Sequence, residues 1–301
     1  MVLLLAVCGG APATAQGVDH WWGGFGLQGV EPAVPGMPAG VTAMAVYRGR
    51  LVVAGQFGQA GRTPCSNIAA WDGRQWHPLL GTAGDGVTDP TGSAVVEALA
   101  VYQGELVVAG RFASAGGVAV QNIARWNGFR WAPLGSGITG SHLPATPVVK
   151  ALAVYGGQLY AGGHFLQAGG VAVGCIARWD GATGQWSTAG PGFLWPRRPD
   201  LTVVNALAVH GGRLVAAGVF QMQSPTGAPA NHIAAWDGST WRNLGSGLAD
   251  AVEAVADDGH GGLLAGGLFT WPARYLARWD GTSWGPATAG DAPQGEVSTL
   301  V

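Results

Sequence analysis

The sequence predicts an all-β chain folded as a β-propeller, in which four-stranded sheets, the blades, are arranged around a central axis. Two observations predict this fold class. One block of sequence recurs along the chain at intervals of about 40 to 57 residues, the length of a propeller blade. Every copy contains four short apolar runs separated by glycine-containing turns, and none shows the periodicity of a helix.

Composition and charge exclude several classes of protein. Only 11% of the 301 residues are charged and the net charge is −2, so no basic surface is expected to bind nucleic acid. The hydrophobic content of 48% excludes disorder through low hydrophobicity, and the 53 glycines follow no three-residue period that would indicate collagen. No apolar run reaches the ~18 residues of a membrane-spanning helix. We therefore expect a globular chain without a membrane span.

Residues 1–15 are expected to be a signal peptide rather than part of the fold. A short apolar run, Val2–Val7, is followed by Ala13-Thr14-Ala15, which has the small-x-small pattern of a cleavage site. No lysine or arginine precedes Arg48, so the positively charged start of a signal peptide is missing and the N-terminus is expected to be clipped. The sequence thus predicts an exported protein, secreted, periplasmic or on the cell surface, whose folded part covers residues 16–301.

Paired tryptophans mark five complete repeats between Val41 and about Pro286. The first tryptophan of each pair ends an apolar run, and the second follows a short turn. The pairs are Trp71 with Trp76, Trp126 with Trp131, Trp179 with Trp186, Trp236 with Trp241 and Trp279 with Trp284. Because an indole buries a large apolar area, we expect these side chains to pack between successive blades.

Each repeat is expected to form four strands, named A to D in chain order. In the second repeat, strand A is Val96–Tyr102, strand B is Leu106–Gly110, strand C is Ile123–Trp126 and strand D begins at Trp131. An Asx-Gly pair connects C to D, which is a strong hairpin signal because glycine reaches positive φ without a Cβ clash. These pairs are Asp72-Gly73, Asn127-Gly128, Asp180-Gly181, Asp237-Gly238 and Asp280-Gly281.

The third repeat carries a resemblance to a known class of propeller. Its run Leu159-Tyr160-Ala161-Gly162-Gly163 precedes Phe165, Ala168-Gly169-Gly170 and Ile176-Ala177-Arg178-Trp179-Asp180-Gly181. This pattern resembles kelch-type repeats, and it is similar to repeats of secreted bacterial proteins of unknown role and of the fungal bud-site cortical marker propeller. The resemblance covers roughly residues 16 to 301 and implies the propeller fold. It implies little about activity, since such propellers serve as enzymes, adhesins and docking platforms.

The two ends of the chain predict a sixth blade that is split or incomplete. Trp21-Trp22-Gly23-Gly24-Phe25-Gly26 resembles a strand D with its loop, and Val297–Val301 resembles a strand A. Strands B and C of that blade would be missing, so we expect a chain truncated at its C-terminus. A five-bladed ring with an N-terminal strap is the alternative.

No cofactor, metal site or disulfide is expected. Cys65 and Cys175 belong to repeats one and three, and cysteines in non-adjacent blades should lie farther apart than the ~7 Å that a disulfide allows between Cα atoms. These are the two cysteines that follow the expected signal peptide, and two make no zinc motif; the seven histidines show no i, i+2 or i, i+4 pairs.

Binding residues are expected where the loops differ. If strands alternate in direction, the short A–B and C–D turns share one rim of the propeller, and the B–C and D–A loops share the other. Long and dissimilar loops on that rim are Gly58–Ser66, Gly81–Ala94, Ser136–Pro147, Gly190–Thr202 and Gln221–Ala230. The second residue of strand A starts at the same rim and also differs between repeats: Thr42, Glu97, Lys150, Asn205 and Glu253, with Ser298 at the corresponding place in the last run. Varied residues on a repeated scaffold are typical of binding surfaces.

The sequence therefore predicts an exported, non-catalytic and monomeric binding scaffold. Its ligand, a protein or a glycan, is expected at the mouth of the propeller's central channel, on the rim that carries the long loops. Two alternatives stay open. One is a hydrolase or lyase acting on polysaccharide, with Glu97 and Glu253 as acid and base, although these residues would lie farther apart than the roughly 5 to 10 Å of a glycosidase pair. The other is a purely structural module of a cell-surface protein.

Overall fold

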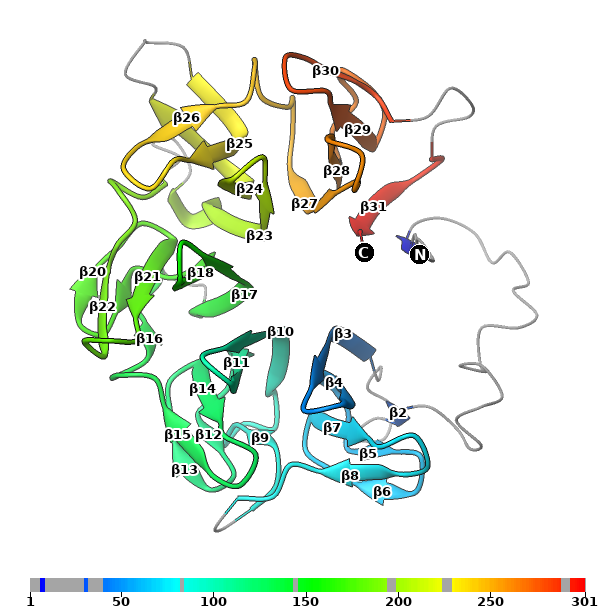
Figure 1. Cartoon of the computed structure of the whole chain (residues 1–301), viewed down its shortest axis with the longest axis vertical. Helices are drawn as coiled ribbons and strands as arrows, with labels where there is room; N and C mark the ends of the chain where they lie inside the picture. The colour runs from blue at the N-terminus through cyan, green and yellow to red at the C-terminus, as the bar shows by residue number, and fades with distance from the viewer. Residues whose placement is uncertain are drawn as a thin grey trace.

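The computed structural model shows an all-β chain whose sheets are arranged around a central axis (Figure 1). It describes residues 6–8, 30–31, 40–81, 84–142, 146–193, 199–223, 229–287 and 293–300. Five antiparallel four-stranded sheets form the blades, and each consists of strands consecutive in the chain apart from short strands in the loops. The propeller fold with five full blades is confirmed.

The five blades are numbered in chain order, and each has its strands in the spatial order A-B-C-D. Blade 1 consists of β3 (Gly40–Tyr47), β4 (Arg50–Gln56), β7 (Ile68–Trp71) and β8 (Trp76–Pro78). Blade 2 consists of β10 (Val95–Tyr102), β11 (Glu105–Arg111), β14 (Ile123–Trp126) and β15 (Trp131–Pro133). Blade 3 consists of β17 (Val148–Tyr155), β18 (Gln158–His164), β21 (Ile176–Asp180) and β22 (Gln185–Thr188). Blade 4 consists of β23 (Val203–His210), β24 (Arg213–Gln223), β25 (Pro229–Trp236) and β26 (Trp241–Asn243). Blade 5 consists of β27 (Val252–Asp257), β28 (Leu263–Gly267), β29 (Leu276–Trp279) and β30 (Trp284–Pro286).

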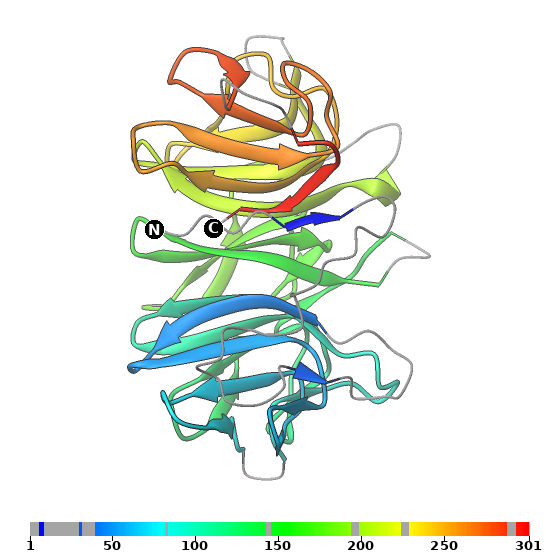
Figure 2. The ribbon, with the colours of Figure 1, turned by 90° about the vertical axis from the view of Figure 1, so that its right-hand side faces the viewer.

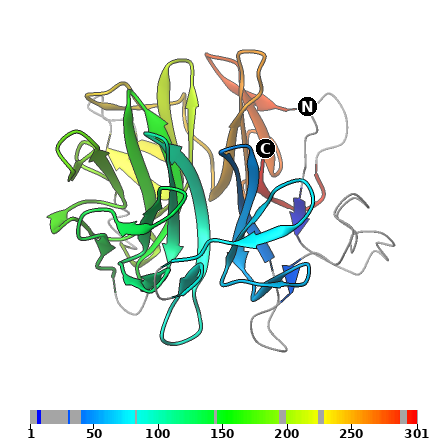
Figure 3. The same ribbon diagram turned by 60° about the horizontal axis from the view of Figure 1, so that its bottom comes forward.

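Strand A is the innermost strand of every blade, and the A strands of neighbouring blades contact one another around the axis (Figure 1). Seen from another side, the sheets stand next to one another with their strands running between two rims (Figure 3). All strand pairs within a blade are antiparallel. Hence the A–B and C–D turns lie together on one rim, the turn rim, and the B–C and D–A connections lie on the other, the loop rim.

The C–D turns form as the Asx-Gly pairs predict. The Asp237 carboxylate accepts hydrogen bonds from the backbone N–H groups of Ser239 (2.9 Å) and Thr240 (2.8 Å), and Gly238 has a φ of 101°. This is an Asx-turn, in which the side chain satisfies backbone donors that the strands leave unpaired. Blade 3 differs, because its turn is longer and the positive φ, 66°, falls on Gly184 rather than on Gly181.

The tryptophan pairs link each blade to the one before it. Trp126 and Trp131 have ring centroids 5.2 Å apart, and both side chains are buried. The indole N–H of Trp131 donates to the carbonyl of Leu79 in the preceding blade, at 3.1 Å. The second tryptophan of each later blade repeats this bond to a carbonyl of the blade before, at 2.8–3.0 Å: Trp186 to Leu134, Trp241 to Ala189, and Trp284 to Leu244. The predicted packing of tryptophan between blades is confirmed for the pairs of blades 2 to 5, whereas Trp76 packs against residues of its own blade 1.

The apolar core consists of clusters that mostly span two blades. One cluster joins Val52 and Ile68 of blade 1 to Leu106, Phe112 and Trp126 of blade 2. Equivalent clusters join blades 2 and 3, blades 3 and 4, and blades 4 and 5. On the turn rim, the Tyr47 hydroxyl donates to the carbonyl of Gly104 at 3.1 Å, so a polar contact also crosses between blades 1 and 2. Each blade is therefore stabilised mainly by its neighbours, as in other repeat folds.

The B–C connections of blades 1 to 3 share one structure, and their sequences are similar: Ala60-Gly61, Ala115-Gly116-Gly117 and Ala168-Gly169-Gly170 stand at the same place. Each contains a short hairpin, formed by β5 (Gln59–Ala60) with β6 (Thr63–Pro64), β12 (Ser114–Ala115) with β13 (Val118–Ala119), and β19 (Gln167–Ala168) with β20 (Val171–Ala172). A strand from the segment before the blade completes each three-stranded sheet: β2 (Val30–Glu31), β9 (Val87–Thr88) and β16 (Ile138–Thr139). In blade 4 the strands β24 and β25 themselves extend into the connection. A 3₁₀ turn, Pro199–Leu201, precedes blade 4.

A two-stranded sheet lies after blade 5. It consists of β31 (Glu296–Thr299) and β1 (Ala6–Cys8), which run antiparallel beside each other (Figure 2). β31 contacts β27 and β28, and Val297 is fully buried against Gly266, so β31 takes the place of a strand A in a sixth blade. β1 falls within the segment expected to be a signal peptide, whose cleavage would remove it. The expected strand D at residues 21–26 lies outside the described residues.

Cys65 and Cys175 are both buried free thiols, as their positions in blades 1 and 3 predict. Burial raises the pKa of Cys65 to about 12 and that of Cys175 to about 11. Both thiols are therefore protonated near neutral pH, which lowers their reactivity in the folded protein.

Candidate functional site

The five residues predicted to bind are the bulged residues of five equivalent β-bulges. In blade 2, Val96 pairs with Gly110 and Ala98 with Ala109, so Glu97 is left without a cross-strand partner. The same shift of register leaves out one residue of strand A in the other blades: Thr42, Lys150, Asn205 and Glu253. A bulge bends the strand locally and re-aims the side chain of the extra residue.

A glycine on strand B makes each bulge possible. A Cβ on Gly110 would overlap the carbonyl oxygen of Val95 and lie 2.9 Å from the Cα atom of Val96. Gly163 and Gly218 stand in the same relation to their own A strands. The glycine that ends each apolar run of strand B is therefore required by the close approach of two backbones, and the bulged residue is positioned by it.

The bulged side chains meet in one pocket around the axis, at the end of the A strands near the loop rim. The pocket has a volume of about 570 Å³, and all five predicted residues line it together with Ser298 of β31. Ser298 is also skipped in the pairing of β31 with β1, so it repeats the bulge in the sixth position. We refer to these six residues as the polar ring: Thr42, Glu97, Lys150, Asn205, Glu253 and Ser298.

Hydrogen bonds tie members of the polar ring to one another or to the backbone of neighbouring blades. The Lys150 ammonium group donates to the side-chain oxygen of Asn205 at 3.2 Å, and the Asn205 amide group donates to the carbonyl of Val252 at 3.1 Å. The Thr42 hydroxyl contacts the carbonyls of Ala54 and Val96. The ring thus spans from blade to blade, and its side chains are partly fixed before any ligand arrives.

Electrostatics in the ring are dominated by burial of its two carboxyl groups. Burial raises the pKa of Glu97, and the nearby Lys150 and Arg111 oppose the rise. Burial also raises the pKa of Glu253, which Lys150 lowers and Glu296 raises further. Lys150, the only lysine of the chain, therefore interacts with both carboxylates. Burial thus favours the protonated form of both carboxyl groups, relative to exposed glutamates.

An apolar belt lies next to the polar ring along the axis. It is formed by the residue two positions after each bulge: Met44, Leu99, Leu152, Leu207, Val255 and Leu300. Sequence reasoning missed this belt because these residues are part of the repeated apolar run of strand A, and a repeated residue gave no sign of a binding surface. Their alternation with the alanines of strand A was the available signal, since residues two apart point to the same face.

The described residues contain no group of three or more His, Cys, Asp or Glu side chains arranged to hold a metal ion. Within the same part of the chain, no helix is long and apolar enough to cross a membrane. What the pocket offers is therefore hydrogen-bond donors and acceptors, with an apolar surface beside them.

Comparison with known proteins gives matches to solved structures alone. No family model matches the chain, and no curated protein matches it. Similar structures include the computationally designed Ika8 protein, with 16% identity and a TM-score of 0.44 over 90% of this chain and 68% of that one. Two extracellular domains from B. thetaiotaomicron are also similar. One belongs to a protein described as a one component system (13% identity, TM-score 0.39, 89% of this chain and 37% of that one), and the other to one described as a hybrid two component system (12%, 0.46, 81% and 29%). The chain thus spans well under half the length of these two bacterial chains.

Proposed function

We propose that this chain is an exported, non-catalytic binding module that holds a hydroxyl-rich ligand, such as the end of a glycan, at the polar ring. The single observation that carries the proposal is the position of the ring residues. In strand A, the apolar and aromatic positions repeat from blade to blade, whereas the bulged position holds threonine, glutamate, lysine or asparagine. A bulged residue makes no cross-strand pair, so the fold does not dictate its identity.

The chemistry of the ring fits a neutral polyhydroxyl ligand. Carboxylates accept hydrogen bonds from hydroxyl groups, the Lys150 ammonium donates them, and the Asn205 amide does both. The apolar belt next to the ring would contact the C–H face of a sugar. A pocket of about 570 Å³ is within the ordinary size range of small-ligand sites.

Binding to a panel of immobilised neutral glycans tests this function. We expect saturable binding by the unmodified protein and a loss of about tenfold or more in the double variant Glu97→Gln, Glu253→Gln, because each carboxylate replaced removes a charge-assisted hydrogen bond. The matched control is Glu105→Gln, which changes a carboxylate on the turn rim. Binding that survives the double substitution, or that is lost equally in the control, would contradict the proposal.

Export is part of the proposal and rests on the N-terminal sequence, with its apolar run and the Ala13-Thr14-Ala15 site. N-terminal sequencing of protein collected from the medium or periplasm tests this part. We expect Gln16 as the first residue, and a retained Met1 would contradict cleavage.

A second candidate is a polysaccharide hydrolase or lyase that uses Glu97 and Glu253. One observation favours it: both carboxyl groups line the same pocket and both have raised pKa values, which is common for catalytic acids. Release of new reducing ends or unsaturated products from a bound glycan would identify an enzyme. Saturable binding without such products would identify a binding module, and no binding at all would favour a structural role.

A further inference from the structure

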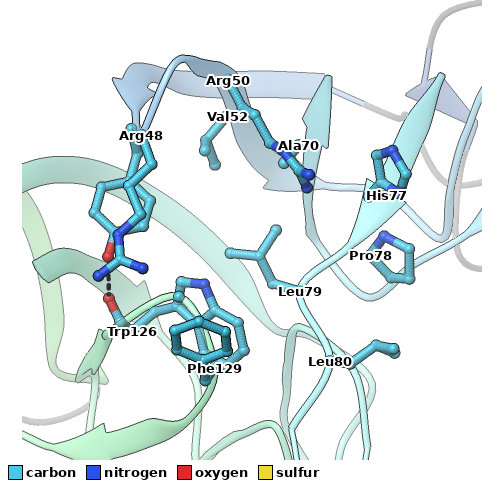
Figure 4. A pocket seen from close by; sticks show the side chains of 12 residues that line it. Arg48, Arg50, Val52, Ala70, His77, Pro78, Leu79, Leu80, Trp126 and Phe129 are labelled. Carbon is cyan, nitrogen blue, oxygen red and sulfur yellow. Dashed lines mark hydrogen bonds between the residues drawn. The ribbon is translucent and has the colours of Figure 1, made fainter. Parts of the chain in front are cut away.

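A second pocket lies between blades 1 and 2, toward the turn rim and away from the polar ring (Figure 4). Its volume is about 520 Å³. Blade 1 contributes the A–B turn with Arg48 and Arg50, and its strand D and the following residues contribute His77–Leu80. Blade 2 contributes Trp126 and the C–D turn with Phe129. We refer to this pocket as the first interblade groove.

The repeat itself builds the shape of this groove, because the same groove recurs between blades 2 and 3. That second interblade groove, of about 460 Å³, is lined by Tyr102, Val107, Pro133, Leu134, Trp179 and Gly181, which correspond in the repeat to Tyr47, Val52, Pro78, Leu79, Trp126 and Gly128. The side chains at the rim differ. Arg48 and Arg50 of the first groove correspond to Gln103 and Glu105 of the second. The chain therefore contains a cationic groove and a natural counterpart without its two arginines.

Arg48 is held in place from several sides. Its guanidinium carbon lies 5.3 Å from the centroid of the Tyr47 ring and 5.7 Å from that of Phe129, which are cation–π distances. Gly128 leaves the space that the guanidinium occupies, because a Cβ at this position would overlap it. A guanidinium fixed in this way loses little freedom when it binds an anion, and its planar fork matches a carboxylate.

The charge of the two arginines is not neutralised within the described residues. None of the carboxylates there forms an ion pair with Arg48 or Arg50, whereas the nearby acidic groups have other partners. Asp72 binds His77 at 2.6 Å, and Glu105 binds Arg125 at 3.2 Å.

Apolar side chains at the edge of the groove are exposed well beyond what is usual for their type. Phe129 is 78% exposed and Leu80 is 60% exposed, although both line the pocket. Figure 4 shows Phe129 beside Trp126 and below Arg48, and Leu80 following Leu79 along the other side. Here an exposed aromatic ring and an exposed aliphatic side chain lie next to two guanidinium groups that form no ion pair with a described carboxylate. The apolar side chains can cover the apolar part of a ligand, and the guanidinium groups can bind an anionic group.

We propose that the first interblade groove binds a small amphipathic carboxylate, a molecule in which a carboxylate is joined to an aromatic or aliphatic body. Arg48 and Arg50 receive the carboxylate, and Phe129 and Leu80 cover the body. The site is separate from the polar ring and does not depend on the function proposed there.

Titration calorimetry with 4-phenylbutyrate tests the proposal. The neutral analogue is 4-phenylbutanamide, and inorganic phosphate serves as an anion that lacks an apolar part. We expect the carboxylate to bind the unmodified protein at least about tenfold more tightly than the amide, because the neutral amide cannot form an ion pair with the guanidinium groups and has one acceptor oxygen instead of two. Phosphate should bind far more weakly than the carboxylate. Equal affinity for carboxylate and amide would overturn the role of the arginines, and equal affinity for phosphate would show a simple anion site.

Substitutions that introduce residues of the second interblade groove into the first give a more specific test. Arg48→Gln with Arg50→Glu installs the residues of that groove and should reduce carboxylate affinity about tenfold or more. Phe129→Ser, at a highly exposed position, should weaken the carboxylate and the amide together without lowering the thermal midpoint. Arg213→Glu is the matched control, since Arg213 holds the same place in blade 4 and is exposed. Retention of affinity in the double variant, or equal loss in the control, would overturn the proposal.

Discussion

Replacement of Gly163 by alanine tests whether the glycines of strand B hold the bulges that form the polar ring. A Cβ at this position would overlap the carbonyl oxygen of Val148 and would lie 2.9 Å from the Cα atom of Val149 and 3.1 Å from the nitrogen of Lys150. All three are backbone atoms, so no side-chain rotation can relieve the overlap. Strands A and B of blade 3 must move apart, or the bulge must rearrange.

The expected cost is about 1–3 kcal/mol, the range measured when extra atoms are forced into a well-packed interior. Urea unfolding followed by tryptophan fluorescence measures it, with the midpoint and the slope analysed separately. Gly285→Ala is the control, because a Cβ there has no atom within 4 Å and φ lies outside the left-handed region. Alanine at that position should be neutral or stabilise by about 0.4–1 kcal/mol, through the reduced entropy of the unfolded chain.

A second measurement follows the bulged residue itself. Lys150 is the only lysine, so amine-selective labelling detects its side chain and the N-terminal amine alone. Rearrangement of the bulge in Gly163→Ala should change the labelling rate of Lys150, whereas Gly285→Ala should leave it unchanged. If Gly163→Ala were as stable as the unmodified protein and labelled at the same rate, the assignment of glycine to the bulge would be refuted.

Three further predictions concern the core, the thiols and the ring. Trp126→Ala should cost about 3–5 kcal/mol, the usual range for a buried large aromatic side chain, and an unchanged thermal midpoint would contradict the blade register. The folded protein at pH 8 should react slowly with a thiol reagent, since burial raises the pKa of Cys65 and Cys175, and the denatured chain beginning at Gln16 should titrate two thiols without reductant. Glu97→Gln should stabilise the protein more at pH 7 than at pH 4.5. The pKa of Glu97 is raised in the folded protein, so folding favours the protonated side chain. As the pH rises above the ordinary pKa of 4.5, the side chain ionises and the folded protein loses this stabilisation, whereas glutamine at the same position does not ionise. An equal effect at both pH values in urea unfolding would contradict this reasoning.

The blades could be predicted from the sequence because their signals are local or recur. Asx-Gly pairs fix the C–D turns of blades 1, 2, 4 and 5 through the φ of a single glycine, and the tryptophan pairs recur at the same place in each unit. The position of Glu97 near the loop rim also follows from the alternation of strand directions. Its role as a bulged residue does not, because the bulge depends on the close approach of Gly110 from another strand.

Other features depend on contacts between segments that no local pattern records. The short strand β9, which lies between blades 1 and 2 in the chain, pairs with β12 in the B–C connection of blade 2. The first interblade groove combines Arg48 of one blade with Phe129 of the next. When each repeat is considered alone, both residues are predicted to lie in exposed turns, and their contact across two blades is not predicted.

The bulge explains how one chain can repeat its fold and vary its chemistry. In a regular antiparallel strand, each residue faces a partner across the ladder, so a substitution changes a cross-strand contact. The bulged residue has no such partner. The close approach of the two backbones restricts the glycine of strand B instead, because a Cβ there would overlap strand A. Hence Thr42, Glu97, Lys150, Asn205 and Glu253 can differ while the valine, alanine and glycine positions around them stay the same. Exchange of Glu97 with Lys150 should accordingly leave the strand register intact and change only what the polar ring binds.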